Sequence, residues 1–579
     1  MTDMVLDWHS YSIDKLYNLV EQISFFSEED QSHVWKIIVK WAQQTASDSD
    51  KAAMREKIRV TTLSRRALIH TKKNGNTLGL AATRKEVYAA LEPLEIINKH
   101  SWLFRSGWIQ ESADDSEKLE EVDFKAREER TQDMRVNALR EIFELQGSAG
   151  ILELAKLGQA SWIVGSLLAN YVLSRKDLEE LLTFTLPCIK ENSEYAGLYK
   201  NLVRGLIRSL ADNDLRRGVI ESVTKGHPEV QVVEILLLST FSRDTWAWVD
   251  TLSVESQSKY WEEVTPEHIH DSPSECNESV ERLLNHGRPR AAFSGVCHSL
   301  KKINPDILAK LLWAVIQPGK EQAGHYMLDM YYVQEAFKQL NDSGISTVDQ
   351  MASLEFAYID ILGESLGRQE GYQIPNLERY IESHPEFFVK AICWIYKRSD
   401  EGADPVELQV MEDQRRVMAK RGMKLLHSLN NIPGHNEDGE LEATLLLSWV
   451  VAVRDACDMY SRYGKADYWI GELLAHAPVG MDGVWPCEPV REVIEHIQSE
   501  KMVHGAQIGT FNMRGAHFRG EDGAQERELA EKYRSWSEAL RISHPFVSSQ
   551  LLLNLATSYD YDALREDTNA GVRRRLNSH

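Results

Sequence analysis

The 579-residue sequence predicts an all-α protein whose helices follow one another along the chain. Amphipathic stretches with apolar residues three or four positions apart recur from end to end, which is typical of helices that bury one face. The segment from residue 441 shows this spacing most clearly, with Leu445, Trp449, Val453 and Tyr460 on one helical face. The strict alternation that marks half-buried strands does not come between these stretches. Serially packed helices build an extended surface more readily than a closed catalytic pocket.

Residues 1–110 are expected to form an N-terminal helical domain. Apolar residues share one helical face over residues 13–20 and again over residues 34–41. Acidic side chains open the second of these helices, where they favour the positive end of the helix dipole. A strongly acidic tract with few apolar residues follows at 111–130, and it predicts a linker or a charged helix between domains.

Residues 131–430 are expected to form a helical-repeat array. One apolar helix ends near Gly147 and another begins at Ile151, and the same order recurs around Gly287, where a second helix starts near Ala291. An apolar helix, a glycine turn and a second helix make up the hairpin unit of HEAT-like and TPR-like arrays. Because the spacing between units varies, the sequence predicts an irregular α-solenoid of helix hairpins.

Residues 440–579 are expected to form a C-terminal helical domain, which a loop containing proline and glycine at 431–439 separates from the array. The N- and C-terminal domains are thus helical end-pieces of the solenoid. Two final helices are expected at 525–540 and 547–565. Helical periodicity is lost between residues 509 and 520, so this stretch is expected to form a loop.

The chain carries 88 acidic and 66 basic side chains, for a formal net charge of -22. Such a charge repels a polyanion at long range, which disfavours broad coating of nucleic acid but permits a local basic patch. Six scattered cysteines without a CxxC pair argue against a disulfide framework and against a thiolate zinc site. The first residues lack a signal-peptide pattern, and no apolar run is long enough to span a bilayer. These features predict a cytoplasmic protein without membrane contact.

The segment Arg55–Lys99 is locally basic and is the best candidate for contact with nucleic acid or an acidic partner. Its candidate contact residues are Arg65, Arg66, Lys72 and Lys73. The alternative interpretation is that these side chains cover the outer faces of two ordinary helices, where charged residues are expected in any case.

The common motifs of nucleotide-binding proteins and metalloproteases do not occur. The sequence contains neither a P-loop pattern, nor a dinucleotide-binding fingerprint after a strand, nor HExxH. One stretch, Gly363-Glu-Ser365-Leu-Gly367, matches the GxSxG pattern of serine hydrolases. A nucleophile elbow needs a strand before the serine, whereas a helical stretch precedes Ser365, so we predict no catalytic residue.

A short histidine-rich loop is the candidate metal site that the sequence offers. His268, His270 and Asp271, with His286 nearby, carry imidazole and carboxylate groups that suit zinc or iron. Prolines flank the loop, and polar side chains are expected there without any metal. The sequence therefore predicts neither a metal site nor a cofactor.

The expected loop Asn512–Arg519 concentrates polar side chains among glycines. The candidate contacts for a ligand or partner are Asn512, Arg514, His517, Arg519 and, in the helix that follows, Arg527. Arginine can bind a carboxylate or phosphate through two parallel hydrogen bonds, and glycine lets a ligand approach the backbone closely. The alternative interpretation is that Arg514 and Arg519 hold the loop in place through buried ion pairs and contacts with carbonyl groups.

Three stretches together resemble the C-terminal helical half of large bacterial ATP-binding proteins of the STAND/AAA type, which are linked to anti-phage defence. They are Lys99-His-Ser-Trp-Leu-Phe104 with Trp108; Ala138–Leu157 leading to Val164-Gly165; and Asn512-Met-Arg-Gly515 with Gln525-Glu-Arg527, Ala530 and Tyr533. The resemblance covers most of the chain and implies a helical sensor or scaffold that recognises another macromolecule. The N-terminal ATPase of such proteins has no counterpart in this sequence.

The sequence thus predicts a non-catalytic scaffold or sensor for protein recognition, and the resemblance implies that it is a component of a bacterial anti-phage defence system. Its expected partner is a separately encoded ATPase or a phage protein. Two alternatives stay open. One is an enzyme or ligand-binding protein that uses the Asn512–Arg519 loop, and the other is nucleic-acid binding through Arg55–Lys99.

Overall fold

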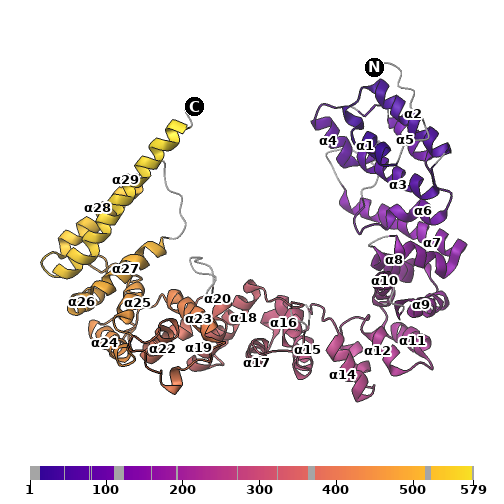
Figure 1. The fold of residues 1–579 in the computed structure, drawn as a ribbon. Helices are drawn as coiled ribbons and strands as arrows, with labels where there is room; N and C mark the ends of the chain where they lie inside the picture. Colours follow the sequence, from indigo (N-terminus) through magenta and orange to yellow (C-terminus); the bar gives the residue numbers. More distant parts are fainter. Residues whose placement is uncertain are drawn as a thin grey trace. The chain divides into compact units, whose positions relative to one another are not determined.

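The computed structural model confirms the all-α prediction (Figure 1). It describes residues 13–44, 46–76, 78–79, 81–109, 123–157, 160–190, 194–269, 272–321, 324–362, 372–514 and 523–576. Within these ranges the chain forms 29 α-helices, joined by turns and short 3-10 or π segments. A β-bridge between His435 and Leu441 spans the end of the loop expected at 431–439. Among the described helices, none has both the length and the apolar composition that crossing a bilayer requires.

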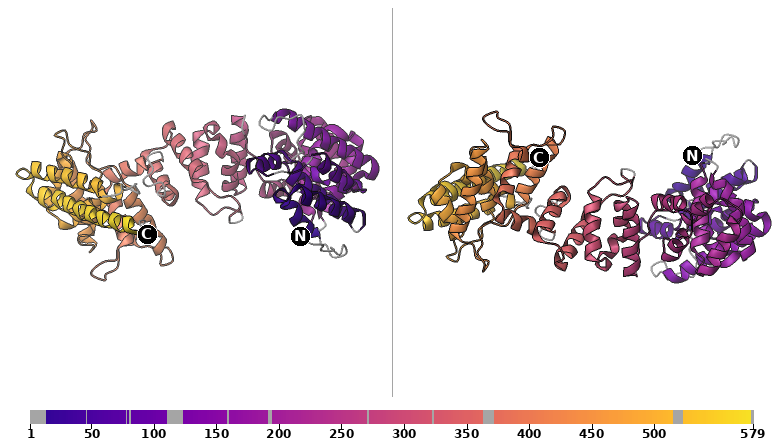
Figure 2. Two further views of the ribbon diagram at one scale, coloured as in Figure 1. Left: turned by 90° about the horizontal axis from the view of Figure 1, so that it is seen from above. Right: turned by 90° about the horizontal axis from the view of Figure 1, so that it is seen from below.

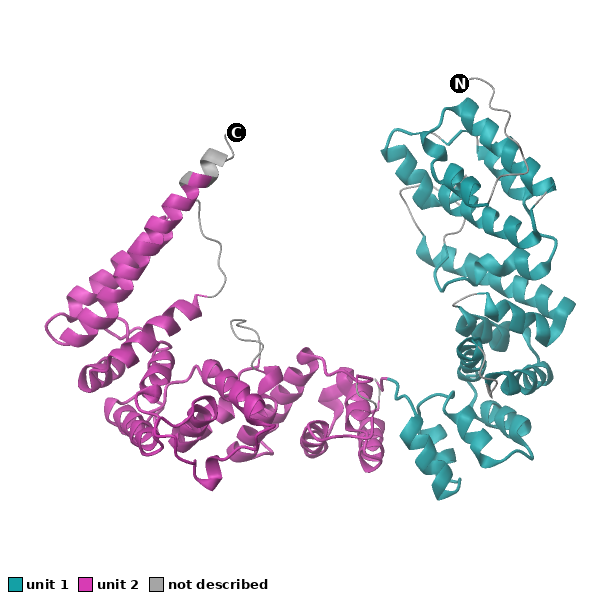
Figure 3. Cartoon of the chain, in the orientation of Figure 1, with its two compact units in different colours: residues 1–267 teal, residues 268–579 magenta. Residues whose placement is uncertain are grey.

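The chain divides into two compact units, residues 1–267 and residues 268–579 (Figure 3). The domain boundaries expected near residues 110, 130 and 430–440 are finer than this division and stay predictions. The helices of unit 1 are α1 (Ile13–Glu21), α2 (Glu28–Gln44), α3 (Asp48–Ile58), α4 (Arg65–Lys73), α5 (Ala81–Ala90), α6 (Ile96–His100), α7 (Phe124–Lys156), α8 (Ser161–Leu167), α9 (Arg175–Lys190), α10 (Ala196–Arg208), α11 (Asn213–Thr224), α12 (Glu229–Leu236), α13 (Arg243–Val249) and α14 (Val254–Glu263).

Unit 2 holds the remaining fifteen described helices. They are α15 (Pro273–Asn285), α16 (Pro289–Val296), α17 (Pro305–Val315), α18 (Met330–Ser343), α19 (Val348–Ala357), α20 (Ile359–Leu362), α21 (Pro375–Ser383), α22 (Pro385–Ile395), α23 (Arg415–Ser428), α24 (Ala443–Met459), α25 (Lys465–Leu474), α26 (Glu488–Ile497), α27 (Glu500–Met513), α28 (Ala524–Leu540) and α29 (Leu553–Leu576).

Within each unit, helices pack mainly on helices that are near them in the sequence. In unit 1, α8 packs on α10 and α9 packs on α11, while in unit 2, α22 packs on α23 and α24 packs on α26. Helices α28 and α29 lie side by side in each view (Figures 1 and 2). This neighbour-to-neighbour packing is what a chain of amphipathic helix hairpins produces, because each hairpin can bury its apolar face only on the next.

The glycine turns that the sequence places between helices are confirmed. Gly147 interrupts α7 with φ 57° and ψ -149°, which are dihedral angles that glycine adopts without steric cost. Gly287 has a φ of 72° in the turn that separates α15 from α16. In both places the chain changes direction where a side chain would resist the left-handed backbone.

In unit 1, α8 and α10 cross so closely that only glycine fits at the crossing. A Cβ atom on Gly165 would lie 2.2 Å from the carbonyl oxygen of Leu202, and one on Gly205 would lie 2.2 Å from the carbonyl oxygen of Trp162. Each glycine therefore faces the backbone of the other helix. The main chains pack directly against each other at this point.

The same reciprocal crossing recurs between α25 and α27 in unit 2. A Cβ atom on Gly471 would lie 1.9 Å from the carbonyl oxygen of Met502, and one on Gly505 would lie 2.0 Å from that of Tyr468. The local sequences also agree, since residues 160–169 (ASWIVGSLLA) and 466–475 (ADYWIGELLA) share five of ten residues. The two units thus contain the same helix pair.

The expectation of a loop from residue 509 is wrong for its first five residues, because α27 continues to Met513. Gly509 faces α25, where a Cβ atom would lie 2.7 Å from both the Ala475 side chain and the Glu472 backbone. Glycine here serves close helix packing and does not end the helix. The final helix is also longer than expected, since α29 reaches Leu576.

Candidate functional site

Three of the four basic residues predicted to contact nucleic acid line one cavity in unit 1. They lie on α4, whose N-terminus is capped by the Ser64 hydroxyl, which accepts a hydrogen bond from the Ala67 amide. The cavity has a volume of about 430 Å³. Its lining residues are Ser64, Arg65, Arg66, Ile69, His70, Lys73, Trp108 and Arg127. Lys72 lies next to Lys73 in sequence but is not among the residues that line the cavity.

An aromatic side chain and a further cation complete this α4 cavity. Trp108 is 66% exposed, and the guanidinium of Arg127 in α7 lies 5.6 Å from the centroid of its ring. Both residues also line an adjoining cavity of about 390 Å³. An exposed indole beside several cations offers a stacking surface and a positive field in the same place.

The lining of the α4 cavity contains no acidic residue among the described side chains. This reflects the sequence, because the stretch from Lys57 to Lys85 carries eight lysines and arginines and no aspartate or glutamate. A larger cavity of about 810 Å³ in the same unit differs, since acidic residues line it as well. There His100 lies 2.7 Å from Glu141, and Arg55 lies 3.8 Å from Glu92. The α4 cavity is therefore the more strongly cationic of the two.

Two other cations of the Arg55–Lys99 segment serve the fold. Arg59 is buried, binds the Glu56 carboxylate at 2.6 and 2.9 Å, and stacks on the Trp102 ring at 4.4 Å. Arg84 is also buried and donates to the carbonyl oxygens of Leu78 and Gly79 at 2.6 and 2.9 Å. The basic segment thus contains both buried cations that stabilise the fold and exposed cations. The sequence does not distinguish the two kinds, whereas the structure does.

The described residues among the predicted C-terminal contacts lie at helix ends in unit 2 and face carboxylates of the same unit. The guanidinium of Arg514 is 3.8 Å from the buried Glu526 carboxylate, and Arg527 pairs with Asp567 at 2.7 Å. Asn512 donates to Glu472 at 3.4 Å. The Arg514 contact agrees with the structural interpretation of that residue, and a binding role for Asn512, Arg514 and Arg527 stays a prediction. His517 and Arg519 lie outside the described residues.

Of the residues weighed for catalysis or metal binding, the structure describes His268 and His286. Ser365, His270 and Asp271 lie outside the described residues. His286 forms a hydrogen bond within its own helix end, where its Nδ1 atom lies 2.8 Å from the Arg282 carbonyl oxygen. His268 lies instead beside Cys297 and His298.

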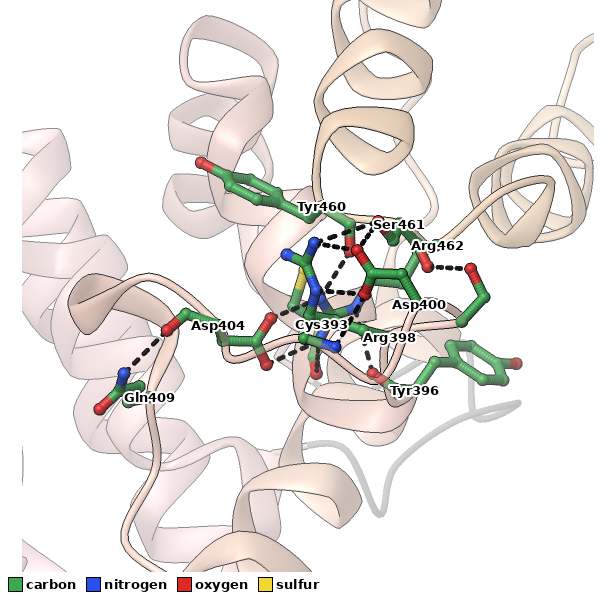
Figure 4. A network of polar contacts seen from close by, with 11 residues as sticks. Cys393, Tyr396, Arg398, Asp400, Asp404, Gln409, Tyr460, Ser461 and Arg462 are labelled. Atoms are coloured by element: carbon green, nitrogen blue, oxygen red, sulfur yellow. Dashed lines mark hydrogen bonds and ion pairs between the residues drawn. The ribbon is translucent and has the colours of Figure 1, made fainter.

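Sequence reasoning missed a buried arginine that joins the ends of α22 and α24 (Figure 4). Arg462 is 2% exposed and binds the two carboxylate oxygens of Asp404 at 2.5 and 2.9 Å. It also donates to the carbonyl oxygens of Tyr396 and Tyr460 at 3.2 and 2.8 Å. The hydrogen bond from Arg462 holds the pKa of Asp404 below its usual range. One side chain thus satisfies acceptors from three parts of the chain.

A second ion pair in this network involves Arg398 and Asp400, whose atoms meet at 2.5 and 2.7 Å (Figure 4). The Ser461 hydroxyl donates to Asp400 at 2.7 Å. The hydrogen bond from Arg398 is the main reason why the pKa of Asp400 is lowered. The network binds the loop between α22 and α23 to the residues that follow α24. Its role is therefore to stabilise the fold.

Comparison of the chain with protein-family models, with curated proteins and with solved structures gives no match.

Proposed function

We propose that this chain is a non-catalytic scaffold, an irregular α-solenoid of helix hairpins that recognises a protein partner. The observation that carries the proposal is a strip of four half-buried aromatic side chains in unit 2, made of Phe356, Tyr380, Phe387 and Trp394. Ring centroids within the strip are 5.3 to 6.0 Å apart. Contiguous, partly exposed aromatic surface is typical of interaction sites, where such side chains supply most of the binding energy.

The proposed occupant of this aromatic strip is an apolar segment of a partner protein. The resemblance to defence proteins supports two kinds of partner, a separately encoded ATPase and a phage protein, and a role in a bacterial anti-phage system. The six cysteines are all free thiols, which supports a reducing cytoplasm as the site of action.

Affinity capture from the native host, with and without phage infection, tests the scaffold. We expect wild type to retain a specific protein and Trp394→Ala to retain at least about tenfold less, because truncation of an aromatic anchor commonly costs 2 kcal/mol or more. Lys390→Glu, between Phe387 and Trp394 on α22, is a second test that keeps every aromatic ring. Val417→Ser, on α23 and 49% exposed, is the control outside the strip. Absence of a partner in both conditions, or equal retention by all variants, contradicts the proposal.

A second candidate function is binding of single-stranded nucleic acid at the α4 cavity. The specific observation in its favour is an exposed indole among four cationic side chains and one imidazole, with no carboxylate among the described lining residues. Single strands bind where a positive groove follows the phosphates and aromatic rings stack on the bases. Because the chain as a whole is strongly acidic, this binding is expected to be local and steeply dependent on salt.

Fluorescence anisotropy with a labelled single-stranded oligonucleotide at low salt tests this candidate. We expect Lys73→Glu to weaken binding several-fold and Lys72→Glu, the same change one residue away and outside the cavity, to leave it nearly unchanged. Arg65→Ala with Arg66→Ala should lower the slope of log affinity against log salt by about 1.4. Equal effects of the two lysine changes, or no binding at low salt, would rule the site out.

A further inference from the structure

Three side chains that commonly bind metals converge in unit 2, away from both proposed binding surfaces. They are His268, Cys297 and His298, and one donor atom from each lies within 4.8 Å of the other two. His268 precedes α15, whereas Cys297 and His298 begin the 3-10 segment η6 (Cys297–Lys302) directly after α16. The cluster therefore joins two stretches of chain that are 29 residues apart.

Main-chain contacts hold these two stretches together. The Ile269 amide donates to the Gly295 carbonyl oxygen at 3.3 Å, and the Ser299 hydroxyl donates to the Ile269 carbonyl oxygen at 2.6 Å. The Ile269 side chain is buried. Ile269 follows His268, and its hydrogen-bond partners Gly295 and Ser299 lie on either side of Cys297 and His298. These hydrogen bonds therefore hold the three donor residues close together.

The ring of His298 is further oriented by Tyr332 of α18. The Tyr332 hydroxyl lies 2.7 Å from the Nδ1 atom of His298, and the rings of His268 and His298 meet edge to face at 4.3 Å. In metal sites, a histidine ligand usually has its second nitrogen fixed by a hydrogen bond of this kind. A metal bound at Nε2 of His298 would leave the bond to Tyr332 in place.

We propose that His268, Cys297 and His298 form a binding site for a divalent transition-metal ion of the zinc type. One thiolate and two imidazoles are donors that zinc prefers, and hard cations such as magnesium do not. Three protein ligands leave the fourth position of a tetrahedral zinc to water or to an external ligand. The site extends beyond the scaffold function, and it departs from the sequence-based expectation of no metal.

The observed spacing needs only a small adjustment to fit the ion. Zinc–sulfur bonds of about 2.3 Å and zinc–nitrogen bonds of about 2.0 Å put tetrahedral donors roughly 3.3 to 3.6 Å apart. His268 is exposed, so adjustment of its imidazole ring can close the remaining distance while Tyr332 keeps the ring of His298 in place.

Binding would release one proton for each ion. Zinc binds the thiolate form of cysteine, whereas an ordinary cysteine thiol carries its proton at neutral pH. The zinc ion forms a bond to the sulfur, the S–H bond breaks, and the proton passes to the solvent without any change in oxidation state. Affinity should therefore fall as the pH is lowered.

Titration of the metal-stripped full chain tests the site. By calorimetry with Zn²⁺ we expect one ion per chain and an enthalpy that changes with the ionisation enthalpy of the buffer, because a proton is released. With Co²⁺ we expect a sulfur-to-metal charge-transfer band and visible bands of tetrahedral intensity. Cys297→Ser and His268→Asn should each weaken binding at least tenfold, and Tyr332→Phe by about tenfold, as expected for an outer-shell partner.

Matched variants distinguish this site from adventitious metal binding. His286→Asn removes a nearby histidine that is bonded to the Arg282 carbonyl oxygen, and Cys188→Ser removes a half-buried thiol in unit 1. Both should bind Zn²⁺ like wild type. Circular dichroism checks that each variant is folded. The proposal is overturned if wild type binds no stoichiometric Zn²⁺, if Cys297→Ser binds it equally well, or if bound Co²⁺ lacks the charge-transfer band.

Discussion

Gly205→Ala is expected to lower the local stability of the α8–α10 pair by about 3 kcal/mol, the upper part of the usual range for overpacking. The added methyl group would lie 2.2 Å from the Trp162 carbonyl oxygen, a backbone atom that cannot move without displacing α8. Hydrogen–deuterium exchange measures the effect, because amide protection in α8 and α10 reports local opening.

A control for this prediction lies in the same helix. Gly197 in α10 has no neighbouring atom within 4 Å of where its Cβ would lie. Gly197→Ala should therefore leave protection unchanged or raise it slightly, by about 0.5 kcal/mol, since alanine favours the helix. Identical exchange in the two variants would mean that the helices do not cross at Gly205 as described.

Arg462→Met is expected to destabilise the α22–α24 region of unit 2 by about 3 kcal/mol, the lower end of the range for breaking a buried ion pair. The arginine side chain is 1% exposed while Asp404 is 26% exposed, so the carboxylate left behind keeps some contact with water. The carbonyl oxygens of Tyr396 and Tyr460 also lose their donor. Thermal denaturation and hydrogen exchange of the α22 and α24 peptides measure the loss.

Arg415→Met supplies the comparison, because Arg415 pairs with Glu412 on the surface, where both side chains are mostly exposed. No measurable change is expected there, since exposed pairs contribute little. A loss of stability at Arg415 as large as that at Arg462 would contradict the assignment of Arg462 to a buried structural network.

The Arg462 effect should depend on pH in a defined direction. Since the pKa of Asp404 is lowered in the folded chain, its stabilisation is present above the unfolded value of about 3.9 and is lost as the pH falls through the folded-state value. The difference in stability between wild type and Arg462→Met should therefore shrink as the pH falls below about 4. Urea denaturation at a series of pH values measures it, and a constant difference would contradict the pair.

The sequence predicts helices well where apolar spacing and a glycine turn agree. The break at Gly147, the turn at Gly287 and the start of α28 all follow from such local patterns. Prediction failed from Gly509 to Met513, because the glycines of α27 contact α25, and a contact with a distant helix leaves no trace in local periodicity. A glycine can end a helix or allow a second helix to pack closely against it. Tertiary contacts, which the local sequence does not show, decide between these two roles.

The candidate sites could be predicted only in part for the same reason. Local charge density identified Arg65, Arg66 and Lys73, which lie on one helix. It could not identify Trp108 and Arg127, because they reach the α4 cavity from other elements. The HxHD spacing likewise drew attention to His270 and Asp271, whereas the partners of His268 lie 29 and 30 residues further along the chain.

The reciprocal glycine crossing has a consequence for how this chain tolerates insertions and deletions. The paired glycines are 40 residues apart in unit 1 and 34 residues apart in unit 2, yet the two backbones meet in the same way. Differences in length are accommodated in the connecting segments that contain α9 and α26. Those connectors are therefore the natural places to lengthen, shorten or exchange sequence when new versions of either unit are engineered.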